Sequence, residues 1–148
     1  MEYGPSPESP QAAKDWLARH DGQFGLFINN EFTAPHNLFA ASNPADGSLL
    51  AQLTQANEAE VDAAVAAARA ALGPWQALSG HQRARVLYAL ARLLQKHSRL
   101  FAVLETLDNG KPIRESRDID IPLCARHFSY HAGWAQLLPT EMPRYRAV

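Results

Sequence analysis

The sequence predicts a mixed α/β fold in which β-hairpins at the front of the chain are covered by three or four outer α-helices. Short runs of strand-forming residues, separated by turn residues, lie between positions 24 and 54. From position 57 onward, apolar residues instead repeat at helical spacing behind capping motifs. The length of 148 residues suits one domain, and a composition of 47% hydrophobic and 20% charged residues is ordinary for a soluble globular protein.

Residues 1–22 are expected to form an extended leader that contains one short helix. Three prolines among Ser and Glu predict an extended start within residues 1–10. Residues 11–20 show a short helical pattern, in which Trp16 and Leu17 can anchor the leader to the body. Asp21-Gly22 then predicts a turn.

Two hairpins are predicted next. In the first, a strand over Phe24–Ile28 returns over Glu31–Thr33, and the intervening Asn29-Asn30 pair tolerates a positive φ. In the second, Leu38–Ser42 and Leu49–Thr54 flank a turn at residues 43–47. Two isolated hairpins are marginally stable, so they need a covering layer.

Capping boxes predict where the covering helices begin. Asn57 with Glu60 starts one helix, which is expected to end at Gly73-Pro74 with Trp75 just beyond it. Ser79 with Gln82 starts a second helix. The apolar face of the first helix is formed by Val61, Val65, Ala68 and Leu72, and that of the second by Val86, Leu87, Leu90, Leu93 and Leu94.

The second helical pattern is expected to be broken near His97, with Ser98 capping a further helix. A last helix is predicted to start around Pro122 and to run to about Leu138. The tail from Pro139 to Val148 is predicted to be extended.

The run Glu105–Pro112 closes the third helical pattern. Asn109-Gly110 can supply the left-handed residue that ends a helix, and Pro112 cannot continue one. Asp108 therefore lies at the negative end of a helix dipole, where a carboxylate needs a partner. That partner is backbone N–H groups, the side chain of Lys111 or Arg114, or a bound cation.

Composition excludes several classes of function. The net charge of −1 gives no reason to expect binding to nucleic acid or to an anionic membrane. No apolar run reaches the ~20 residues of a membrane span, and the N-terminus lacks the features of a signal peptide. A single cysteine excludes an internal disulfide and fits a reducing compartment. A cytoplasmic protein is expected.

No catalytic apparatus is recognisable in the chain. Neither a Gly-rich phosphate loop nor a Ser nucleophile elbow is present. Cys124 and His131 are separated by roughly 10 Å of helix, which is too far for one tetrahedral ion, and a third ligand for His127 and His131 is not evident. Cys124 is therefore expected to be a buried, inert thiol. A further set of basic residues is interpreted as a solvated helix face: Arg83, Arg85, Arg92, Lys96 and Arg99.

From Phe27 onward the chain resembles the N-terminal portion of the aldehyde dehydrogenase superfamily. The resemblance is carried, in this order, by residues 27–32, 43–47, 57–75, 83–94, 104–112 and 130–135. Residues 2–9 resemble the leader of the sixteenth aldehyde dehydrogenase family. The resemblance implies that residues 23–148 are the N-terminal segment of a Rossmann-like cofactor-binding domain, incomplete as a domain.

The resemblance also implies where the chemistry would lie. The oxyanion-stabilising Asn, the cofactor-binding Lys and Glu, the general base and the nucleophilic Cys of the family all correspond to positions beyond Val148, so no catalytic or cofactor-binding residue is assigned here. Cys124 does not match the nucleophile motif. One site transfers: a structural monovalent cation, held by the carbonyls of Ala41 and Ser42 and by the carboxylate of Asp108.

The resulting expectation is a fragment of an NAD(P)-dependent aldehyde dehydrogenase. The complete protein is expected to oxidise a small-molecule aldehyde through a cysteine thiohemiacetal and to be a homo-oligomer, whereas the fragment alone is inactive. The alternatives are a non-catalytic aldehyde-dehydrogenase-like scaffold or a helical interaction protein. Because the strands and helices lack neighbours, the isolated chain is expected to be poorly soluble or molten.

Overall fold

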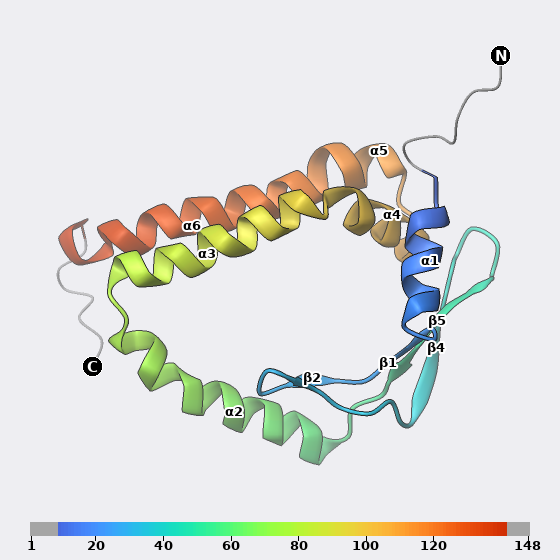
Figure 1. Ribbon diagram of the computed structural model, residues 1–148, viewed down its shortest axis with the longest axis horizontal. Helices are drawn as coiled ribbons and strands as arrows, with labels where there is room; N and C mark the ends of the chain where they lie inside the picture. Colours follow the sequence, from blue (N-terminus) through green and yellow to red (C-terminus); the bar gives the residue numbers. More distant parts are fainter. Residues whose placement is uncertain (1–8, 142–148) are drawn as a thin grey trace.

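The computed structural model describes residues 9–141, which form a mixed α/β structure (Figure 1). Two small sheets and the helix α1 lie at one side, and two long helices, α3 and α6, run side by side away from them. The helix α2 returns along the opposite side (Figure 1). The predicted fold class, front strands with four long outer helices, is confirmed.

The main sheet has three strands in the order β1-β5-β4. The predicted second hairpin is confirmed with its bounds: β4 (Leu38–Ser42) pairs antiparallel with β5 (Leu49–Thr54). On its other edge β5 pairs in parallel with β1 (Gln23–Phe24). The prediction of one continuous strand over residues 24–28 was therefore wrong. Phe24 belongs to the main sheet, whereas residues 27–28 form a strand of the second sheet.

The second sheet is a short hairpin of β2 (Phe27–Ile28) and β3 (Glu31–Phe32). Asn29 and Asn30 connect the strands with φ angles of 52° and 65°, which confirms the predicted turn with positive φ. The rings of Phe27 and Phe32 lie 4.7 Å apart across the hairpin, although both side chains are exposed.

Helix α1 (Gln11–Arg19) is anchored as expected from the sequence. The ring of Trp16 stacks on Phe24 of β1 at 5.5 Å, and Ala13 is buried. Asp21 and Gly22 make the predicted turn, both with positive φ. The first eight residues of the predicted leader lie outside the described residues.

Helix α2 (Glu58–Ala77) begins at the predicted capping box of Asn57 and Glu60. Its predicted end at Gly73-Pro74 was wrong, because Pro74 lies inside the helix and Trp75 belongs to the last turn. The residue before a proline normally avoids helical geometry through a clash of its Cβ, and Gly73 has no Cβ. The helix stops instead where Ser79 opens the next one.

Helices α3 (Gly80–Lys96) and α4 (Ser98–Asn109) meet at His97, as predicted. The capping box of Ser79 and Gln82 is present. Ser98 is not the expected cap, since it is the first helical residue and His97 occupies the N-cap without a side-chain hydrogen bond. His97 is the one residue between the two helices, with φ −105° and ψ 16°.

The last helical stretch is longer than predicted. A short helix α5 (Ile113–Glu115) and a π-turn η1 (Ser116–Asp120) lead without a break into α6 (Ile121–Glu141). The predicted start near Pro122 is confirmed, but helix extends through positions 139–141, where an extended tail was expected. The remainder of that tail lies outside the described residues.

The core is small and rich in alanine. Helices α3 and α6 approach closely because they face each other with Ala84 and Ala91 on one side and Ala125 and Ala132 on the other, all nearly inaccessible to solvent. By contrast, α2 buries no side chain. The accessible area is 11069 Å², against about 7,500 Å² for a compact monomer of this mass. Much of the apolar surface is therefore uncovered.

Candidate functional site

The predicted helix end is present around Gly110. Helix α4 stops at Asn109, and Gly110 follows with a left-handed φ of 77° and donates its N–H to Thr106. The side chain of Asn109 is held between two neighbours: its amide donates to Glu105 at 2.6 Å, and its oxygen accepts the N–H of Lys111 at 2.8 Å. These bonds fix the last turn of the helix, and with it the position of Asp108.

Asp108 has no partner within the chain as far as the structure describes it. Lys111, one predicted partner, instead binds Asp120 at 2.5 Å, and this hydrogen bond raises the pKa of the Lys111 ammonium. Among residues 9–141, neither Arg114 nor any backbone N–H contacts the Asp108 carboxylate at hydrogen-bonding distance. Asp108 is exposed, so its carboxylate is open to solvent, and the bound cation stays a prediction.

The structure brings Asp108 and Ala41 to one pocket of about 380 Å³. Apolar side chains of α1, the main sheet and α4 provide most of its wall, including Trp16 and Phe101. Ser42, the third predicted ligand, does not line it.

A bulge in the main sheet lies between the two predicted carbonyl ligands. Ala41 pairs with Ala51, but Ser42 pairs with Leu49, so Leu50 is an extra residue in β5. A bulge interrupts the ladder and leaves backbone groups unpaired. The three predicted cation ligands are all oxygen atoms, which hard cations prefer. Three oxygen ligands are fewer than a full coordination shell needs. The described residues thus fit part of a cation site, which stays a prediction.

Cys124 is exposed, so the prediction of a buried thiol was wrong. The next residue on α6, Ala125, is buried against α3. Consecutive helical residues point about 100° apart around the helix axis, so Cys124 lies outside the packed face. His131 lies against Tyr130, with the ring centroids 5.3 Å apart. Within the described part of the chain, no group of three or more His, Cys, Asp or Glu side chains is close enough to hold a metal ion.

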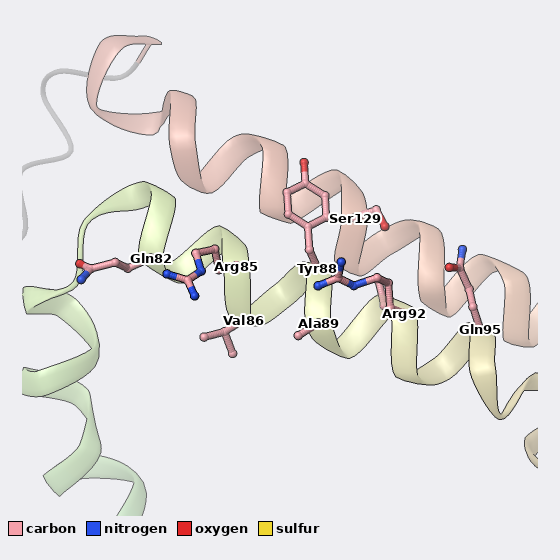
Figure 2. Close-up of a pocket in the computed structure, with 9 residues that line it drawn as sticks. Gln82, Arg85, Val86, Tyr88, Ala89, Arg92, Gln95 and Ser129 are labelled. Carbon is pink, nitrogen blue, oxygen red and sulfur yellow. The ribbon is translucent and has the colours of Figure 1, made fainter.

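The predicted basic face is not on one helix, because Lys96 lies in the last turn of α3 and Arg99 belongs to α4. The guanidinium of Arg83 is half-buried and donates to the carbonyl oxygens of Leu78 and Gln76, so it closes the connection between α2 and α3. Arg85 and Arg92 lie on another side of the helix and line an open groove next to α6 (Figure 2). The interpretation of the whole set as one solvated face was therefore incomplete, because sequence spacing does not say where α6 lies.

No helix among residues 9–141 is both long and apolar enough to cross a bilayer.

Comparison with known proteins gives a consistent family. A family model described as "Aldehyde dehydrogenase family" matches residues 32–146. The mitochondrial aldehyde dehydrogenase family 2 member B4 of Arabidopsis thaliana is 42% identical over 114 residues, which are 74% of this chain and 21% of that protein. The chain spans less than a quarter of the length of the curated relatives it matches.

Solved structures agree with this result. The NAD+ complex of an aldehyde dehydrogenase from Bacillus cereus is 36% identical, with a TM-score of 0.75, and the match covers 90% of this chain and 26% of that one. An NAD-dependent aldehyde dehydrogenase from Sinorhizobium meliloti is 30% identical, with a TM-score of 0.73, and the match covers 78% and 24%. The similarity to the leader of the sixteenth family stays a prediction, since the family match begins after it.

Proposed function

The chain belongs to the aldehyde dehydrogenase family, and we propose that it forms the N-terminal part of the cofactor-binding domain of an NAD-dependent aldehyde dehydrogenase. The observation that supports this most strongly is the structural match over 90% of the chain to a relative whose NAD+ complex is solved. The same family match does not favour the alternative of a non-catalytic scaffold.

The proposed reaction of the complete protein converts an aldehyde, NAD+ and water into a carboxylic acid, NADH and a proton. A cysteine thiolate would add to the aldehyde carbon, and bound NAD would supply the hydride acceptor that lets the thiohemiacetal become a thioester. Water then hydrolyses the thioester. The complete protein is proposed to act on a small-molecule aldehyde and to form a homo-oligomer. Residues 1–148 are not assigned a catalytic role in this scheme.

These residues contribute structural support to the proposed cofactor-binding domain. Helix α1 contacts both β5 of the main sheet and α4, while the alanine contacts hold α6 along α3. Uncovered apolar side chains on α2 and α3, such as Val65 and Leu93, provide surface against which further parts of the protein can pack.

We also propose that a monovalent cation binds at the Asp108 carboxylate with the carbonyl of Ala41. Binding to the folded state alone raises stability with cation concentration. In a chimaera in which residues 9–141 replace the aligned segment of the Bacillus cereus enzyme, the thermal midpoint should therefore rise on addition of sodium or potassium chloride, and Asp108→Asn should remove this increase. Tetramethylammonium chloride at the same concentration controls for ionic strength. A midpoint that rises equally in the variant would contradict the site.

A chimaera tests the proposed function directly. In the Bacillus cereus enzyme, the segment that aligns with this chain is replaced by residues 9–141 of the chain, and NADH formation is followed with a panel of aldehydes. We expect soluble protein with aldehyde- and NAD-dependent activity, because the segment provides the same structural support. A soluble chimaera that binds no NAD would show that this segment does not replace the corresponding segment of the Bacillus cereus enzyme.

The gene offers a second test. If the reading frame continues past Val148, it should encode a nucleotide-binding strand followed by a cysteine nucleophile motif. A long continuation without that cysteine would overturn the proposed catalytic activity, while leaving the family membership intact.

A further inference from the structure

The dipeptide Asn109-Gly110 has a chemical property besides ending α4. An asparagine side chain can be attacked by the backbone nitrogen of the next residue, and glycine hinders this attack least because it has no Cβ. Of the six asparagines in the sequence, only Asn109 precedes a glycine. Spontaneous deamidation is therefore chemically easiest at this place in the chain.

Deamidation of this dipeptide needs no reactant other than water. The backbone nitrogen of Gly110 attacks Cγ of Asn109 and closes a succinimide ring. The amide nitrogen of Asn109 takes up the proton that the Gly110 nitrogen loses, and it leaves as ammonia. Water then opens the ring at either of its carbonyls, so the product is an aspartyl or an isoaspartyl residue.

Each reacting group is held by a hydrogen bond in the structure. The amide nitrogen of Asn109 donates to a carboxylate oxygen of Glu105 at 2.6 Å, and the amide oxygen accepts the N–H of Lys111 at 2.8 Å. The N–H of Gly110, which includes the attacking nitrogen, donates to the carbonyl of Thr106 at 3.0 Å. Ring closure therefore requires these bonds to open.

Helical geometry also separates the attacking nitrogen from its target. Asn109 is the last residue of α4, and the side chains of a helix point toward its N-terminus. The Asn109 side chain accordingly reaches back one turn to Glu105, whereas the nitrogen of Gly110 lies on the C-terminal side of Asn109. The backbone of Asn109 must rotate out of helical geometry before the two atoms can meet, so the formed turn slows the reaction.

We propose that Asn109 is a deamidation site whose rate is controlled by the last turn of α4, with Glu105 as the residue that holds the reacting side chain. Only molecules in which this turn is open react. The control depends on contacts among residues 105–111, which lie close together in the sequence.

Deamidation would in turn keep the helix end open. The new carboxylate replaces an N–H donor that faces the carboxylate of Glu105. Like charges four residues apart destabilise a helix, and a further acid at the C-terminal end of the helix dipole is unfavourable. Asp108 lies in the same turn, so the modification would change its position as well.

The test follows deamidation by mass spectrometry in the chimaera that carries residues 9–141, incubated at mildly alkaline pH. Glu105→Ala removes the acceptor for the Asn109 amide. Glu105→Gln is the matched control, since its side-chain oxygen can still accept that N–H. A synthetic peptide of residues 105–112 gives the rate without the folded helix. Hydrogen exchange of the Gly110 amide measures opening of the turn, and neither measurement depends on catalytic activity.

We expect the wild-type chimaera to deamidate at Asn109 at least about tenfold more slowly than the synthetic peptide. Glu105→Ala should deamidate about threefold faster than wild type, with faster exchange at Gly110, whereas Glu105→Gln should stay close to wild type. Asn109→Asp, which imitates one product, should also exchange faster at Gly110. A chimaera that deamidates as fast as the peptide, or equal rates in wild type and Glu105→Ala, would overturn the proposal.

Discussion

The imidazole Nε2 of His36 lies 2.8 Å from a carboxylate oxygen of Glu60, and this contact joins the segment between β3 and β4 to the start of α2. The second oxygen of Glu60 accepts the N–H of Asn57 in the capping box. The backbone N–H of His36 donates to Thr54 of β5, which is buried. Since α2 buries no side chain of its own, this contact is one of few that set its direction.

His36→Ala should loosen the first turn of α2. A partly exposed side-chain contact of this kind contributes about 0.5 kcal/mol, so exchange of the amide hydrogens near Asn57 should become roughly twofold faster. The measurement uses the chimaera, in which the helix is covered. Glu60→Gln is the control, because it keeps the capping box and removes only the charge. Exchange that is unchanged in His36→Ala would show that the capping box alone holds the helix.

Two glycines in the helix pair should respond in opposite directions to alanine. A Cβ on Gly80 would overlap the carbonyl oxygen of Ala135, whereas a Cβ on Gly133 would meet no atom within 4 Å. Gly80→Ala should therefore push α3 and α6 apart and destabilise by about 1–3 kcal/mol. Gly133→Ala should stabilise by up to about 1 kcal/mol through helix propensity. Urea unfolding of the chimaera measures the stability change of each variant. Changes of equal size and sign in Gly80→Ala and Gly133→Ala would contradict the close approach of α3 and α6 at Gly80.

The Lys111–Asp120 ion pair should give an alkaline pH dependence of stability. The hydrogen bond to Asp120 raises the pKa of Lys111 above its usual 10.5. A raised folded-state pKa means that the stabilisation is fully present below pH 10.5 and is lost as the pH rises through the folded-state pKa. The stability advantage of wild type over Lys111→Met should thus be constant at neutral pH and shrink above pH 10.5. Urea unfolding midpoints across this pH range measure the difference. If the stability difference between wild type and Lys111→Met does not depend on pH, the Lys111–Asp120 ion pair does not contribute as described.

The 148 residues produced by themselves should be poorly soluble or molten. Among residues 9–141, seven of the nine buried hydrophobic residues are alanines, while large side chains such as Leu72 and Leu93 are exposed. We expect binding of a hydrophobic dye and weak near-ultraviolet circular dichroism, with secondary structure retained. A sharp, reversible two-state melt of the monomeric chain would contradict this expectation.

Local chemistry made most elements predictable. Asn57 and Ser79 mark helix starts because their side chains satisfy backbone N–H groups within three residues. Gly110 marks a helix end because it adopts a left-handed conformation without a Cβ clash. The strands β4 and β5 flank the turn at residues 43–47 that the sequence marks. In each case the interaction partners are close in sequence.

Contacts between distant segments were not predictable in the same way. The parallel pairing of β1 with β5 joins residues 23–24 to 52–53, and no local pattern marks it. The exposure of Cys124 depends on which face of α6 the alanines of α3 cover. At the candidate site, the local helix end placed Asp108 correctly, but Ala41 entered through the family resemblance, and Ser42 was not found in the same pocket.

The sequence by itself determined the capping-box starts of α2 and α3, the helix end at Gly110, the two hairpin turns and the family, because capping, turn geometry and motif order are properties of neighbouring residues. Only the tertiary structure decided that Lys111 pairs with Asp120 and leaves Asp108 free of a partner in the described chain. It also decided that Arg83 closes a helix connection while Arg85 and Arg92 face an open groove. The reason is physical: a side chain's partner is set by which surfaces pack together, and packing joins residues that are far apart in the chain.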